Sequence, residues 1–93
     1  MESVKRRHRR AVERAKALLE RPPASYKVYI IRDPIFDIIA VKQSEVLILK
    51  VVMDEISTDD VRLVRAQPLP GNMTKKILKK EYRKEGFEER ILN

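Results

Sequence analysis

Three short apolar runs follow one another between residues 26 and 53, and they constrain the fold more than any other feature of the chain. The runs are rich in Val, Ile and Tyr, and they cover residues 26–31, 35–41 and 46–53. Each is too short for a typical helix and is bounded by turn-forming residues, so we expect three strands. Because few residues separate the second and third runs, they predict a hairpin that places Lys50 opposite Asp37.

Helix-forming segments lie on both sides of this three-stranded meander. Residues 2–20 carry apolar side chains at the 3.6-residue helical period, and the Pro22-Pro23 pair ends the helix, so residues 1–21 form a basic N-terminal helix. The sequence STDD at residues 57–60 supplies a cap and first-turn carboxylates for a second helix over residues 58–67.

The segment from residue 74 to residue 92 leaves two alternatives. Residues 74–85 are good helix formers, which favours a helix. The apolar residues Ile77, Tyr82, Phe87 and Ile91, placed around Gly86, would also suit a β-hairpin. Either structure would present the lysines of this segment on a polar face.

Composition limits the kinds of protein that this chain can be. Ninety-three residues, 43% hydrophobic and 38% charged, predict one small domain over residues 1–93 with a single core. The absence of Cys and the presence of one His exclude disulfides, thiol nucleophiles and Cys/His zinc sites. His8 has no Ser, Cys or Asp partner nearby in the sequence, which favours a structural role.

No stretch of about 20 uninterrupted apolar residues exists, and the N-terminal segment lacks the apolar centre of a signal peptide. We therefore expect a cytoplasmic protein that does not enter a membrane. The abundance of Lys, Arg and Glu and the scarcity of Asn and Gln are typical of thermophiles.

The formal charge of +7 is concentrated at the two ends of the chain. A field of this sign attracts polyanions, and nucleic acid is the simplest candidate. The run KRRHRR contains no aromatic residue, which favours contacts with the duplex backbone over base stacking. The alternative interpretation is a solvated face of a charge-rich protein. The predicted nucleic-acid-binding residues are Lys5, Arg6, Arg7, Arg9, Arg10 and Arg14.

The segments FDIIAV, QSEV, LILKVV and EGFEERIL carry a resemblance to a known family. With them the chain resembles the archaeal Holliday junction resolvases of the PD-(D/E)xK nuclease superfamily. The resemblance implies an α/β fold: a single nuclease-like αβββαβ domain with a central mixed sheet. It also favours the C-terminal β-hairpin over residues 74–92, because EGFEERIL is similar to the late strand of that family.

The same resemblance implies a divalent-metal site built from an Asp, a Glu-x-Lys pair and a helix Glu. Asp37 matches the Asp of the family. Lys50 and Val52 stand where Glu and Lys are expected, and the helix position falls on Val12 or on the outward-facing Glu13. We therefore expect no catalytic residues and no metal or cofactor, with Asp37 and Lys50 remaining as a cross-strand ion pair on an apolar face.

The resulting functional prediction is an inactive nuclease-like domain that binds double-stranded or branched DNA through basic surfaces. A first alternative is an active Mg²⁺-dependent nuclease whose site keeps Asp37 and recruits Glu45, Asp54 or Glu55. A second alternative is a protein-interaction module without nucleic-acid binding. In that case a homodimer, or pairing with an active resolvase, is expected.

Overall fold

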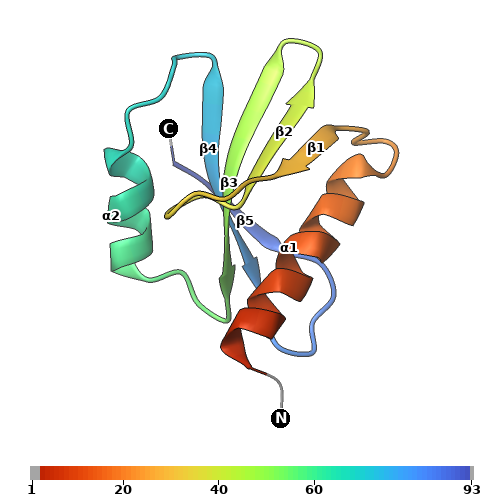
Figure 1. Cartoon of the computed structure of the whole chain (residues 1–93), viewed down its shortest axis with the longest axis vertical. Coiled ribbons are helices and arrows are strands. Elements are labelled where there is room, and N and C mark those ends of the chain that lie inside the picture. The colour runs from red at the N-terminus through yellow and green to blue at the C-terminus, as the bar shows by residue number, and fades with distance from the viewer. Residues whose placement is uncertain (1–2, 93) are drawn as a thin grey trace.

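The computed structural model describes residues 3–92 as an α/β fold with a five-stranded mixed sheet between two helices (Figure 1). The elements, in chain order, are α1 (Val4–Glu20), β1 (Lys27–Ile30), β2 (Ile38–Lys42), β3 (Glu45–Met53), α2 (Thr58–Ala66), β4 (Met73–Lys80) and β5 (Glu88–Ile91). The three predicted strands and both predicted helices are therefore confirmed, with small shifts at their ends. The predicted start of the first helix at residue 2 lies outside the described residues.

The sheet has the strand order β1-β2-β3-β4-β5. β1, β2 and β3 form an antiparallel meander, α2 connects β3 to the parallel strand β4, and β5 pairs antiparallel with β4. The hairpin alternative for the C-terminal segment is thus confirmed. Ile77 and Leu78 are both buried, one on each face of the sheet, and this burial outweighs the local helix propensity.

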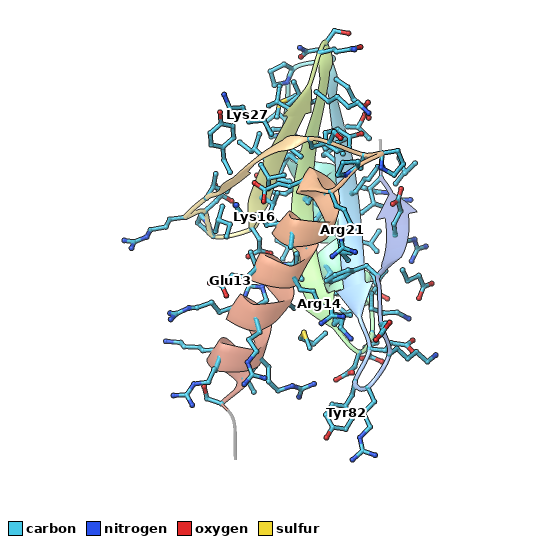
Figure 2. All side chains as sticks on the ribbon, turned by 90° about the vertical axis from the view of Figure 1, so that its right-hand side faces the viewer. Glu13, Arg14, Lys16, Arg21, Lys27 and Tyr82 are labelled. Carbon is cyan, nitrogen blue, oxygen red and sulfur yellow. The ribbon has the colours of Figure 1, made fainter. Side chains whose placement is uncertain are left out.

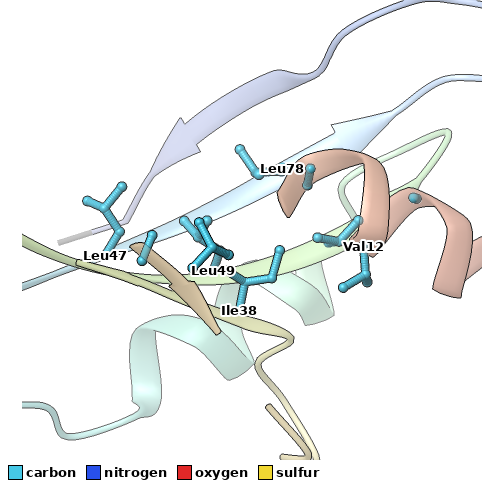
Figure 3. Close-up of a cluster of buried hydrophobic side chains, with 10 residues drawn as sticks. Val12, Ile38, Leu47, Leu49 and Leu78 are labelled. Atoms are coloured by element: carbon cyan, nitrogen blue, oxygen red, sulfur yellow. The ribbon is translucent and has the colours of Figure 1, made fainter. Parts of the chain in front are cut away.

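Each face of the sheet has its own apolar cluster. Ala11, Val12 and Ala15 of α1 pack with strand residues that include Leu49 and Leu78 (Figure 3). Val64 of α2 packs on the opposite face. Odd-numbered β3 residues point toward α1 and even-numbered ones toward α2, as the alternation of a strand requires.

The helix ends follow the rules expected from the sequence. The Ser3 side chain accepts a hydrogen bond from the Arg6 N–H (3.2 Å) and caps α1. At the start of α2, Ser57 and Asp60 form a reciprocal capping box. The Ser3 cap positions the first turn of α1, which carries Lys5, Arg6 and Arg7.

The predicted hairpin register between β2 and β3 is confirmed, with Val41 opposite Val46 and Ile38 opposite Leu49. The register ends at Asp37, one residue before β2. The Asp37 N–H donates to the Leu49 carbonyl (2.8 Å), so Asp37 no longer lies opposite Lys50 as a regular continuation would require.

This irregularity reverses the direction of the Asp37 side chain. Phe36 packs in the cluster on the α2 side and Ile38 in the cluster on the α1 side, so the alternation breaks between them. The Asp37 carboxylate faces α1, whereas the Lys50 Nζ donates to the Ile35 carbonyl (3.2 Å). The predicted Asp37–Lys50 ion pair is therefore wrong, because the two side chains lie on opposite faces.

Candidate nucleic-acid interface

A groove of about 310 Å³ lies between α1 and the ends of β3 and β4. Its walls come from three parts of the chain that are far apart in sequence. Five of the lining side chains are basic, namely Arg7, Arg10, Arg14, Lys80 and Arg83. The two acids in the lining, Glu13 and Glu81, leave an excess of positive charge, and we call this feature the arginine groove.

The basic residues of α1 divide according to the helical period. Arg7, Arg10 and Arg14 lie three and four residues apart, so they share one face of the helix and line the arginine groove. Lys5 and Arg9 are exposed and do not line it. Arg6 is also exposed and outside the lining. Only half of the predicted binding residues therefore converge on one site.

Asp54 holds the walls of the arginine groove together. It follows β3 with a positive φ of 65°, and its N–H donates to the Lys80 carbonyl at the end of β4 (2.9 Å). One carboxylate oxygen accepts from the Arg7 guanidinium (3.4 Å) and the other from the Tyr82 N–H (3.0 Å). One carboxylate thus joins α1, the end of β3 and the β4–β5 connection.

Tyr82 is the aromatic residue of the groove lining. It lies in the β4–β5 connection with 66% of its surface exposed. Figure 2 shows Tyr82 at the tip of this connection and Arg14 on the nearby side of α1. The guanidinium carbons of Arg7 and Arg83 lie 5.6 and 5.3 Å from the ring centroid, in the range of cation–π contacts.

His8 and Asp37 anchor α1 to the sheet next to the groove. The Asp37 Oδ2 accepts from the Val51 N–H (2.8 Å), and its Oδ1 lies 3.3 Å from the His8 Nε2. The same His8 nitrogen is 3.2 Å from the Val51 carbonyl. His8 has no partner in the local sequence, but the backbone irregularity turns Asp37, 29 residues away, toward it. The arrangement fixes the position of α1 relative to β3.

The lysines of β4 face a different environment. Lys76 pairs with Glu89 at 2.8 Å, and Lys79 pairs with Glu81 and Glu88 at 3.0 and 2.5 Å. Hydrogen bonds that Lys79 donates to Glu88 and Glu81 raise the pKa of Lys79. Hydrogen bonds from Lys84 and Lys79 lower the pKa of Glu81 to about 2. These lysines are held by acids of the C-terminal hairpin.

Two of the acids expected beside Asp37 are engaged elsewhere. Glu45, at the start of β3, accepts from the Tyr26 hydroxyl (2.8 Å), and Asp54 is bound to Arg7 and the Tyr82 backbone. Within residues 3–92, no three His, Asp or Glu side chains gather as a metal site would require. The β3 residues on the Asp37 face are apolar, namely Leu47, Leu49, Val51 and Met53.

Sequence reasoning did not assign Lys80, Tyr82 and Arg83 to the site, and it did not foresee that Asp54 would tie the walls of the groove together. The parallel pairing of β3 with β4 brings the C-terminal ends of both strands to the same edge of the sheet. That edge lies beside the first half of α1. A predicted βαβ connection could have indicated this juxtaposition, although not the contacts of Asp54.

Comparisons with known proteins add no relative to this description: no protein-family model, curated protein or solved structure matches the chain. The resemblance to Holliday junction resolvases therefore stays a prediction from the sequence. Neither helix within residues 3–92 combines the length and apolar composition needed to cross a membrane.

Proposed function

We propose that this chain binds nucleic acid through the phosphate backbone, with the arginine groove as its contact surface. The observation that carries the proposal is the convergence of Arg7, Arg10 and Arg14 with Lys80 and Arg83 around one groove. Planar guanidinium groups suit phosphate oxygens because they offer several donors in a fixed geometry.

The distribution of acids supports this surface over the other basic parts of the chain. Arg14 makes no ion pair with any residue in the range 3–92, and the β4 lysines Lys76 and Lys79 already contact glutamates. A phosphate that approached β4 would have to compete with those carboxylates. A phosphate in the groove would meet a net positive lining.

The proposal includes binding without hydrolysis. Both carboxylate oxygens of Asp37 already have partners, the Val51 N–H and the His8 ring. The neighbouring β3 side chains Leu49 and Val51 cannot ligate a cation. These features support an inactive domain, in agreement with the departure of LILKVV from the Glu-x-Lys pattern.

The test compares two double variants that remove the same charge from the same helix. Arg10→Gln with Arg14→Gln alters the groove, and Lys5→Gln with Arg9→Gln alters the outer face of α1. Binding to a labelled oligonucleotide is followed by fluorescence anisotropy as salt is raised. If both arginines contact phosphates, the groove variant should lower the logarithmic salt slope by about 1.4 on single strands or about 1.8 on duplex.

The outer-face variant should change the slope much less. Equal slopes for the two variants would contradict a localised groove and indicate a diffuse field. An absence of binding by the wild-type protein at low salt would overturn the proposal. It would leave the edge strand β1, with half-exposed Tyr29 and Ile30, as the candidate interaction surface.

A further inference from the structure

We propose that the arginine groove accepts a single-stranded segment and that one unpaired base stacks on the ring of Tyr82. The inference rests on the proposed function and adds the class of nucleic acid. It also revises the sequence-based expectation of duplex contacts, which relied on the lack of an aromatic residue within KRRHRR. The fold supplies that aromatic residue from the β4–β5 connection.

The backbone of Tyr82 is fixed while its ring remains accessible. Its N–H donates to the Asp54 Oδ1 at 3.0 Å, which ties the connection to the end of β3. The side chain nevertheless contributes to an exposed surface, with 66% of the residue accessible. An exposed ring on a fixed backbone is suited to stacking because little conformational entropy is lost on binding.

The ring has guanidinium neighbours that can exchange with a base. Arg7 and Arg83 approach the ring centroid at 5.6 and 5.3 Å. At an exposed site, an arginine–aromatic contact is weaker than the stacking of a base on an aromatic side chain. A base can therefore replace one arginine on the ring. The displaced guanidinium then lies close to the phosphate of the stacked nucleotide.

The stacking requirement distinguishes single strands from duplex. In a duplex, each base face is covered by its neighbours in the helix, so a protein ring can reach it only after unstacking. In a single strand, base faces are accessible and every base has one. Phosphate contacts in the groove would be available to both forms, but only an unpaired base gains the contact with Tyr82.

The experiment compares a single-stranded oligonucleotide with a strand of equal length built from abasic phosphodiester units. Both present the same number of phosphates, so the difference in affinity isolates the bases. The wild-type protein should bind the strand with bases about 5- to 150-fold more tightly, the range expected for one stacked base. Tyr82→Leu should abolish this ratio, whereas Tyr82→Phe should retain it.

Intrinsic fluorescence supplies an independent readout, because the chain contains three Tyr and no Trp. In the variant Tyr26→Phe with Tyr29→Phe, Tyr82 is the remaining tyrosine. Its emission should be quenched by the strand with bases and not by the abasic strand.

The outcomes separate the two proposals. Equal binding of both strands by the wild-type protein, or a base-dependent ratio that persists in Tyr82→Leu, would overturn the stacking inference and leave phosphate binding intact. Failure of both strands to bind at low salt would overturn the stacking inference, and failure of a duplex to bind as well would overturn the proposed function itself. Tighter binding to duplex than to the single strand would also contradict stacking on Tyr82.

Discussion

The two most basic elements of the molecule, α1 and β4, carry similar kinds of charge in different surroundings. The arginines of α1 project from a helix whose own acids are few, and three of them line the arginine groove. Three of the four lysines of β4, namely Lys75, Lys76 and Lys79, lie outside the groove and find carboxylates or backbone carbonyls within the fold. The fourth, Lys80, lines the groove while its Nζ donates to the Glu81 carbonyl at 3.1 Å. Positive charge in the sequence is therefore a poor measure of positive charge available for a ligand.

The difference between the β4 lysines and the α1 arginines arises from the ion pairs that each element makes, not from the number of basic residues that it contains. The β4–β5 hairpin places Glu88 opposite Lys79, and Glu89 lies within 2.8 Å of Lys76. On α1, Lys16 pairs with Glu20 one turn later, and Arg7 lies 3.4 Å from the Asp54 carboxylate. The hairpin thus neutralises Lys76 and Lys79 locally, whereas Arg14 of the helix makes no ion pair within residues 3–92 and lines the groove.

The largest effect is expected from Asp37→Ala, because this substitution removes the contacts by which Asp37 holds α1 against the sheet. The substitution leaves the buried Val51 N–H without its acceptor and removes one of the two partners of His8, the other being the Val51 carbonyl. We expect a loss of about 2 kcal/mol in the free energy of unfolding, since a buried unsatisfied donor costs roughly 1–3 kcal/mol. Denaturant unfolding measures this loss directly.

Asp59→Ala is the matched control, because it removes an exposed carboxylate that lies 3.8 Å from Arg62. It should change stability by less than about 0.5 kcal/mol.

A double-mutant cycle of Asp37→Ala with Lys50→Met tests whether these two side chains lie on opposite faces of the sheet. Coupling above about 0.5 kcal/mol would restore the predicted ion pair and contradict the opposite-face arrangement.

Most of the fold was predictable because most elements carry a local pattern, whereas β4 lies in a segment of good helix formers and was expected as a strand only through the family resemblance. Short β-branched runs indicated the strands, the STDD sequence indicated the start of α2, and the turn between β2 and β3 set the register that places Val41 opposite Val46. Asp33, which precedes Pro34, starts a turn. Its carboxylate accepts from the Phe36 and Ile35 N–H groups, which lowers its pKa.

The site was predictable only in part, because it depends on contacts between distant segments. Strand alternation gave the wrong face for Asp37, since a hydrogen bond to Leu49 shifts the backbone just before β2. The run KRRHRR contains no aromatic residue, and this favoured duplex contacts. In the fold, however, the parallel pairing of β3 with β4 brings Tyr82 to the same groove as the arginines. Neither effect leaves a local pattern in the chain.

A second prediction tests the difference between β4 and α1 by replacing one basic residue in each, Lys75 in β4 and Arg14 in α1. The Lys75 Nζ donates to the Arg65 and Gln67 carbonyls, both at 3.1 Å, at the C-terminal end of α2. Lys75→Met should therefore lower the free energy of unfolding by about 1 kcal/mol, because these carbonyls lose a charged donor. Its effect on the salt slope of nucleic-acid binding should be small.

Arg14→Gln should show the opposite behaviour. Stability should change by less than about 0.5 kcal/mol, while the salt slope falls by about 0.7 to 0.9. Thermal unfolding and anisotropy titrations on the same two proteins provide both quantities. A lower slope for Lys75→Met, or an unchanged slope for Arg14→Gln, would remove the distinction between structural lysines and ligand-binding arginines.

The smallest expected effect concerns Glu81, one of the acids that pair with the β4 lysine Lys79. Hydrogen bonds from Lys84 and Lys79 hold the pKa of Glu81 at about 2, below its ordinary value of 4.5. Because the pKa is lower in the folded state, Glu81 stabilises the fold above about pH 4.5 and loses this contribution as the pH falls toward 2. Glu81→Gln should therefore lower the melting temperature slightly at neutral pH, and its difference from wild type should vanish near pH 2. A difference that is the same at both pH values would show that packing, rather than charge, links Glu81 to the lysines.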